Sequence, residues 1–89
     1  MLILENLRYE VCELWVDVGD TADEGVEGTL TFEIADLPSK SKTVKLFFPA
    51  RKEGIPPTPK TGKTHMVIAK LTVGAKTKSV GPLIFKFCS

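Results

Sequence analysis

Apolar and polar residues alternate along most of this chain, and that period of two constrains the fold more than any other feature. The clearest stretch is 29–34, where Leu30, Phe32 and Ile34 alternate with polar residues. The same alternation recurs at 43–48, 65–73 and 83–87. Successive side chains of a β-strand lie on opposite faces of a sheet, whereas an amphipathic helix repeats every three or four residues. The pattern therefore predicts strands that bury one face each, with 65–73 in a central position because it is apolar on both faces.

Short strands at near-regular spacing, separated by loops at 36–42 and 74–79, are typical of small antiparallel folds. We therefore predict an all-β chain of five to seven strands, a small antiparallel β-sandwich or partly open barrel that is immunoglobulin-like in general architecture. With 89 residues there is room for a single domain, 1–89. The predicted core consists of the inward positions of these strands: Leu30, Phe32, Ile34, Val44, Leu46, Phe48, Val67, Ala69, Leu71, Leu83, Phe85 and Phe87.

The N-terminal segment 4–18 fits two structures. Its apolar residues change parity near Cys12, so a strand here needs a bulge or a bend. Heptad spacing of Leu4, Leu7, Val11, Leu14 and Val18, with Gly19 as a stop, is also compatible with a helix. The β-branched and aromatic residues favour the bent strand.

Residues 49–64 form the longest stretch without periodicity, with four prolines and two glycines. We expect an irregular loop, and loops of this length are often functional. Its end resembles a phosphate-binding loop, but Pro57 replaces the first glycine of that motif and a strand follows instead of a helix. The segment is therefore predicted to be a flexible basic loop.

Charge is divided between the two parts of the chain. Residues 1–36 contain ten acids and one base, whereas 37–89 contain eleven bases and one acid, Glu53. One interpretation is internal pairing, with Glu33 next to Lys45 in a hairpin. The other is a bipolar molecule with an acidic loop at 17–27 and a basic loop at 51–63, which suits head-to-tail association or an oppositely charged partner.

The candidate binding residues follow from this division. The acidic set is Asp17, Asp20, Asp23, Glu24 and Glu27, and the basic set is Arg51, Lys52, Lys60 and Lys63. We expect a non-enzymatic binding or assembly module that acts through protein–protein contacts. It could be a structural or accessory protein, a self-assembling component through edge strand 83–87, or a virus-encoded inhibitor. The alternative is a single-stranded nucleic-acid-binding protein that uses loop 51–63 with Phe47 as a stacking platform.

Enzymatic and metal chemistry have little support in the sequence. His65 is the one imidazole of the chain and is expected to be a surface residue at the start of a strand. The acids near 17–24 lack the spacing of an EF-hand, and one histidine with two distant cysteines makes no ligand cluster. We therefore expect no enzyme, no cofactor and no bound metal.

Cys12 and Cys88 fall on the predicted first and last strands, so a disulfide between them is geometrically possible. The favoured interpretation is two free, mostly buried thiols, because the N-terminus lacks the features of a signal peptide and disulfides are rare in an ordinary cytosol. No apolar run is long enough to span a membrane. The expected location is cytoplasmic or within a virion.

Overall fold

The computed structural model describes residues 1–22, 25–55 and 58–89, and the described residues form seven strands and no helix. The strands are β1 (Leu2–Glu10), β2 (Glu13–Asp20), β3 (Val26–Ile34), β4 (Lys40–Leu46), β5 (Arg51–Ile55), β6 (Thr64–Val73) and β7 (Lys76–Lys86). This confirms the predicted all-β class. Within the described ranges, no helix could cross a membrane.

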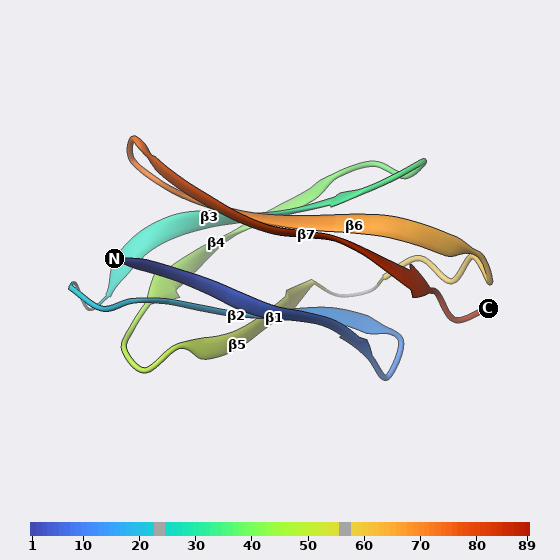
Figure 1. Cartoon of the computed structure of the whole chain (residues 1–89), viewed down its shortest axis with the longest axis horizontal. Helices are drawn as coiled ribbons and strands as arrows, with labels where there is room; N and C mark the ends of the chain where they lie inside the picture. Colours follow the sequence, from blue (N-terminus) through green and yellow to red (C-terminus); the bar gives the residue numbers. More distant parts are fainter. Residues whose placement is uncertain (23–24, 56–57) are drawn as a thin grey trace.

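The strands form two antiparallel sheets that pack face to face as a β-sandwich. The three-stranded sheet has the order β1-β2-β5 and the four-stranded sheet the order β4-β3-β6-β7. Figure 1 shows the two layers, with the N-terminus and the C-terminus at opposite ends of the long axis. In a constant-type immunoglobulin domain the fourth strand belongs with the first, second and fifth, whereas here β4 pairs with β3. The position of β6 between β3 and β7 confirms that this strand is central.

The N-terminal segment is a hairpin, so neither the single bent strand nor the helix is correct. Val11 and Cys12 form a two-residue turn in which both have a positive φ, 51° and 63°. Tyr9 lies opposite Leu14 across this turn, so both face the core. The inward residues are therefore odd-numbered at the end of β1 and even-numbered on β2. A bulge between Glu5 and Arg8 shifts the register once more.

The buried core confirms most of the predicted positions. Leu30, Phe32 and Ile34 are buried, as are six further predicted residues: Val44, Leu46, Val67, Ala69, Leu71 and Phe87. Phe85 is half-buried against this core. β1 and β2 supply the facing layer of the core: Leu2, Leu4, Leu7, Leu14, Val16 and Val18.

Two core predictions are wrong. Phe48 is 56% exposed because β4 ends at Leu46 and the chain has already left the sheet. Leu83 is 41% exposed because β7 is the outermost strand of the wider sheet.

Three predicted loops or registers also need correction. The segment 49–64 is not structureless, since β5 lies within it and pairs with β2. The loop at 74–79 is a two-residue turn, Gly74 and Ala75, because Val73 already pairs with Lys76. β3 and β4 form the predicted hairpin, but Lys45 lies opposite Glu27. Glu33 instead forms an ion pair with Lys70 of β6.

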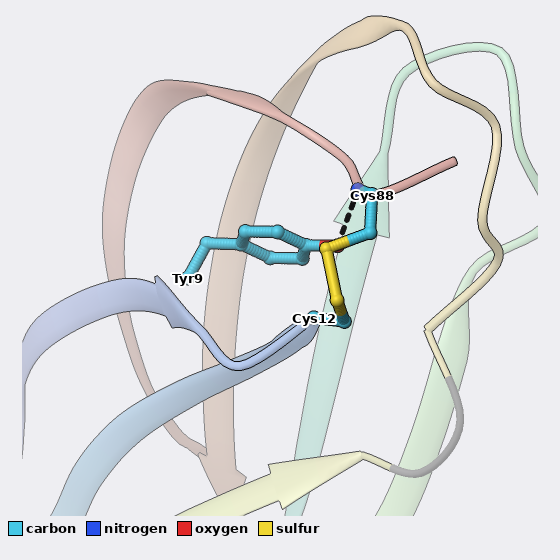
Figure 2. Close-up of a disulfide and its surroundings, with 3 residues drawn as sticks. All are labelled: Tyr9, Cys12 and Cys88. Carbon is cyan, nitrogen blue, oxygen red and sulfur yellow. Dashed lines mark hydrogen bonds between the residues drawn. A yellow bond between two sulfur atoms is a disulfide. The ribbon is translucent and has the colours of Figure 1, made fainter.

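The expectation of free thiols is also wrong: Cys12 and Cys88 are joined by a disulfide, with an S–S distance of 2.08 Å. Figure 2 shows the bond between the β1–β2 turn and the end of the chain, with the Tyr9 ring beside it. The backbone N–H of Cys88 donates a hydrogen bond to the Tyr9 hydroxyl oxygen at 2.9 Å. The same tyrosine stacks on Phe87, with ring centroids 4.9 Å apart. These contacts attach the C-terminal segment to β1.

Candidate interaction surfaces

The two sheets carry opposite net charge. β1, β2 and β5 together hold six acidic and three basic side chains, a net charge of −3. β3, β4, β6 and β7 hold two acidic and seven basic side chains, a net charge of +5. Individual strands do alternate in sign, because acidic β3 lies between basic β4 and β6. The division of charge in the sequence therefore persists between the sheets, although neighbouring strands partly neutralise each other.

The structure does not gather the predicted acidic residues into one exposed loop. Asp17 lies on β2, where Asn6 Nδ2 and Arg8 Nη1 donate hydrogen bonds to its carboxylate at 2.9 and 3.2 Å. Glu27 lies on β3 opposite Lys45. The remaining two, Asp23 and Glu24, lie outside the described residues.

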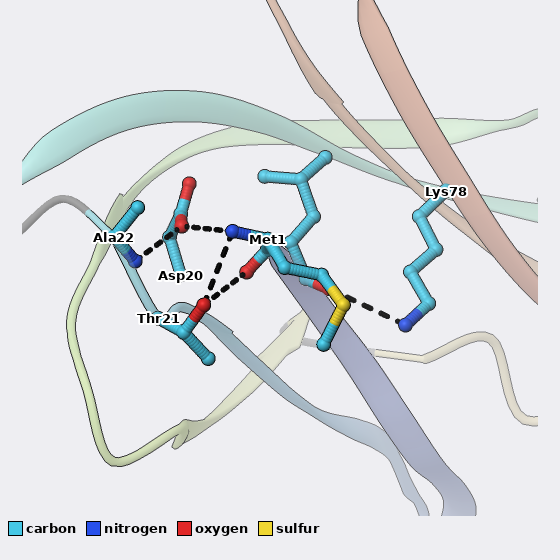
Figure 3. A network of polar contacts seen from close by, with 6 residues as sticks. Met1, Asp20, Thr21, Ala22 and Lys78 are labelled. Carbon is cyan, nitrogen blue, oxygen red and sulfur yellow. Dashed lines mark hydrogen bonds and ion pairs between the residues drawn. The ribbon is translucent and has the colours of Figure 1, made fainter.

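Asp20, the fifth member of that set, is a buried residue of the fold. Its Oδ1 accepts hydrogen bonds from the Met1 ammonium group at 3.0 Å and from the Ala22 N–H at 2.9 Å. Figure 3 shows this network between the N-terminus and the end of β2. Asp20 is therefore unavailable to an external partner.

The predicted basic residues are separated into two pairs. Arg51 and Lys52 begin β5, where Arg51 lies opposite Val18 of β2. Lys60 and Lys63 belong to the segment that precedes β6, which is held to the C-terminus by the Gly62 N–H to Cys88 carbonyl bond. Lys60 lines a depression with Cys12 of the β1–β2 turn. Val18 lies six residues further along the chain, about 20 Å away at 3.3 Å per residue, which places the two basic pairs near opposite ends of the sandwich.

Aromatic rings accompany the first basic pair. The Arg51 guanidinium lies 3.9 Å from the centre of the Phe47 ring, and the Lys52 ammonium lies 4.2 Å from the Trp15 ring. Phe47 is half-buried, and Arg51 covers one of its faces. The neighbouring Phe48, whose alternation predicts a core position, is the more exposed of the two phenylalanines.

His65 is buried, which corrects its expected surface position. Its Nδ1 donates a hydrogen bond to the Ala35 carbonyl oxygen at 3.1 Å, and its Nε2 lies 2.7 Å from Thr61 Oγ1. The ring packs on Phe87, with centroids 4.7 Å apart. Both ring nitrogens are thus occupied by the fold, and the residue connects the segment before β6 with the end of β3.

An apolar surface lies on the outer face of the four-stranded sheet, and we name Met66, Ile68 and Ile84 the sheet patch. Met66 is 46% exposed and Ile84, opposite it on β7, is 66% exposed. Met66 and Ile68 also line a depression of about 310 Å³, together with Glu33, Ile34, Ala35 and Ser39. In the sequence this surface is visible only as two apolar residues, Met66 and Ile68, on the even-numbered face of the strand. Alternation alone does not say which of the two faces the other sheet covers.

A second apolar feature is Val11, at the tip of the β1–β2 turn. Its side chain is 93% exposed. It also lines a depression of about 380 Å³ with Cys12, Glu13, Thr58 and Lys60. Sequence reasoning missed this residue because nothing in the local pattern of Glu10–Glu13 resembles the Asn-Gly turns that usually mark hairpins.

The β7 edge is less suited to strand addition than the sequence suggested. Lys76, Lys78 and Lys86 lie along it, and Gly81–Pro82 accompanies a register shift against β6. Lysines, proline and bulges are the features by which proteins protect edge strands from pairing. In addition, the Lys78 ammonium donates a hydrogen bond to the Leu2 carbonyl oxygen of β1, at 3.3 Å (Figure 3).

No cluster of three or more potential metal ligands occurs in the described part of the chain. Comparison with known proteins identifies no relative: no family model, curated protein or solved structure matches this chain.

Proposed function

We propose that this chain is a non-enzymatic assembly module that associates with further copies of itself through the sheet patch. The observation that carries the proposal is the exposed apolar pair of Met66 and Ile84, which lies with half-buried Ile68 on the outer face of the four-stranded sheet. Single exposed apolar residues are normal, whereas contiguous exposed apolar surface marks interaction sites, and Met66 and Ile84 are direct neighbours across the β6–β7 pair. Complete burial of a fully exposed side chain of this kind contributes about 1.5–3 kcal/mol. Met66 and Ile84 are 46% and 66% exposed, so each would contribute a part of that amount, which suits a weak interface.

Charge supports a second copy as the partner. The four-stranded sheet that carries the patch is positive and the three-stranded sheet is negative, so each molecule presents complementary surfaces to its neighbours. Exposed ion pairs contribute about 0–1 kcal/mol each. The charges would therefore orient the molecules, while the apolar residues supply most of the affinity.

The test is sedimentation velocity or light scattering over a range of concentrations. We expect wild-type protein to form dimers or larger assemblies, and Ile84→Lys to weaken the association by about tenfold or more. The matched control is Thr43→Lys, which places the same charge on the same outer face, on β4. Wild-type protein that stays monomeric at high concentration in low salt would contradict the proposal.

A second candidate function is binding of single-stranded nucleic acid at the opposite end of the sandwich. The observation that favours it is the combination of exposed Phe48 with Arg51 and Lys52, which could stack on bases and contact phosphates. Titration with single-stranded DNA and RNA tests it, because this function requires affinity that falls steeply with salt and is lost in Phe48→Ala.

A further inference from the structure

Val11 combines two unfavourable features that a simple turn residue would avoid. It is β-branched with a φ of 51°, in the left-handed region where such residues are rare. Its apolar side chain is also almost completely exposed to solvent. Two-residue hairpins with positive φ at both positions strongly favour asparagine and glycine, which would remove both costs. Backbone strain at an exposed residue indicates that the residue serves binding and not the stability of the fold.

The turn that carries Val11 is held rigidly. Cys12, its neighbour, is bonded to Cys88, whose N–H is in turn bound by Tyr9 of β1 (Figure 2). The turn is thus fixed from both β1 and the C-terminal segment. A side chain fixed in advance loses little conformational entropy on binding, which favours its use as an anchor in an interface.

The charges around the tip complement those around the sheet patch. Glu10 and Glu13 flank the turn. Glu10 pairs with Arg8 at 3.2 Å, and Glu13 lines the same depression as Lys60. At the patch, Lys86 is two residues from Ile84 on β7, and Glu33, which lines the depression beside Met66, is paired with Lys70. Among the described residues, neither Glu13 nor Lys86 belongs to an ion pair. An apolar tip with a free carboxylate thus matches an apolar patch with a free ammonium group.

We propose that Val11 of one molecule docks on the sheet patch of a second copy, against Met66 and Ile84 and beside the depression that Met66 and Ile68 line. This inference rests on the proposed function, and it names the surface that covers the patch. The contact joins two different surfaces, so it is heterologous and generates rings, chains or reciprocal dimers according to geometry.

The first experiment separates recognition from folding through Val11→Asn. Asparagine tolerates a positive φ, so this variant should unfold about 4–8 °C higher than wild type while it self-associates about tenfold or more weakly. The control is Ala75→Asn at the tip of the β6–β7 turn, which should associate like wild type. If Val11→Asn folds and associates like wild type while Ile84→Lys is monomeric, the assembly module stands and the Val11 contact is wrong.

The second experiment is complementation. Val11→Asn lacks the tip but keeps the patch, and Ile84→Lys lacks the patch but keeps the tip. Each alone should be monomeric at a concentration where wild type associates, and an equimolar mixture should form a heterodimer detectable by sedimentation with one labelled partner. If the mixture stays monomeric, Val11 does not contact the patch and the proposal is overturned.

Discussion

Asp20 illustrates how individual polar contacts hold the ends of strands in this sandwich. The Ala22 N–H and then the Met1 ammonium group hold the pKa of Asp20 below its ordinary value, more than offsetting the opposite effect of burial. A carboxyl group with a lowered pKa in the folded state stabilises the protein above about pH 4, where it is ionised also when unfolded. That contribution is lost as the pH falls toward the folded-state pKa.

Asp20→Asn should therefore lower the free energy of unfolding at neutral pH, and the difference from wild type should shrink on acidification. Urea unfolding at about pH 7 and about pH 3 measures both quantities. Glu5→Gln, at an exposed position of β1, is the control for a general loss of negative charge. A difference between wild type and Asp20→Asn that is equal at both pH values would contradict this account.

Gly54 is required by the Trp15 side chain on the neighbouring strand. A Cβ atom at position 54 would lie 2.6 Å from Trp15 Cε3 and 2.8 Å from the Leu14 carbonyl oxygen. The backbone contact cannot be relieved by a rotamer change, so Gly54→Ala should lower the free energy of unfolding by about 1–3 kcal/mol. Chemical denaturation measures this change, and Thr43→Ala, at an exposed strand position, is the control. An unchanged denaturation midpoint for Gly54→Ala would contradict the prediction, because it would mean that the Trp15 indole moves aside without cost.

At the level of the elements, the disulfide joins the first hairpin to the last strand across a sequence separation of 76 residues. Closing a loop of that length in the unfolded chain stabilises the folded state by about 4 kcal/mol in the chain-entropy model. The paired substitution Cys12→Ser and Cys88→Ser should therefore lower the free energy of unfolding by about that amount. Wild-type protein with reduced, alkylated cysteines is the independent check, and a loss below about 1 kcal/mol in both would contradict the prediction.

The strands that could be predicted are those whose own sequence alternates. β3, β4 and β6 each bury apolar residues at alternate positions, so Leu30, Val44 and Val67 mark them without reference to any partner. β5 lacks this signal, because it is short and begins with Arg51 and Lys52. It is a strand because its backbone pairs with that of β2. Its existence depends on tertiary pairing, which local sequence does not encode.

The candidate surfaces were predictable only in part for a related reason. The parity of Ile84 is visible in the sequence, but its exposure follows from its pairing with Met66 on the outer face of the four-stranded sheet, which a local pattern does not show. The turn at Val11 was missed because its residues contradict local turn preference. Asp20 is buried, unlike the exposed acid that its sequence context predicts, because the end of β2 pairs with the start of β1 beside the Met1 ammonium group.

The whole molecule separates charge between its two sheets, and this has a measurable consequence for association. If contacts between copies bring the positive face of one molecule to the negative surface of another, added salt should weaken them by screening. The apolar contribution of Val11 and the sheet patch should persist. We therefore expect association that weakens with salt without being abolished by it.

Lys86 should contribute most of this salt dependence because it lies beside Ile84. Its replacement in Lys86→Gln should weaken association about two- to fivefold in about 50 mM salt, the effect of one exposed ion pair, and should have little effect in about 500 mM salt. Lys45→Gln removes the same charge from the same sheet, but at a position opposite Glu27, so its effect should be smaller. Dissociation constants from sedimentation equilibrium at both salt concentrations decide the matter. Equal effects of the two substitutions would show that net charge alone, and not the position of Lys86, governs how the molecules meet.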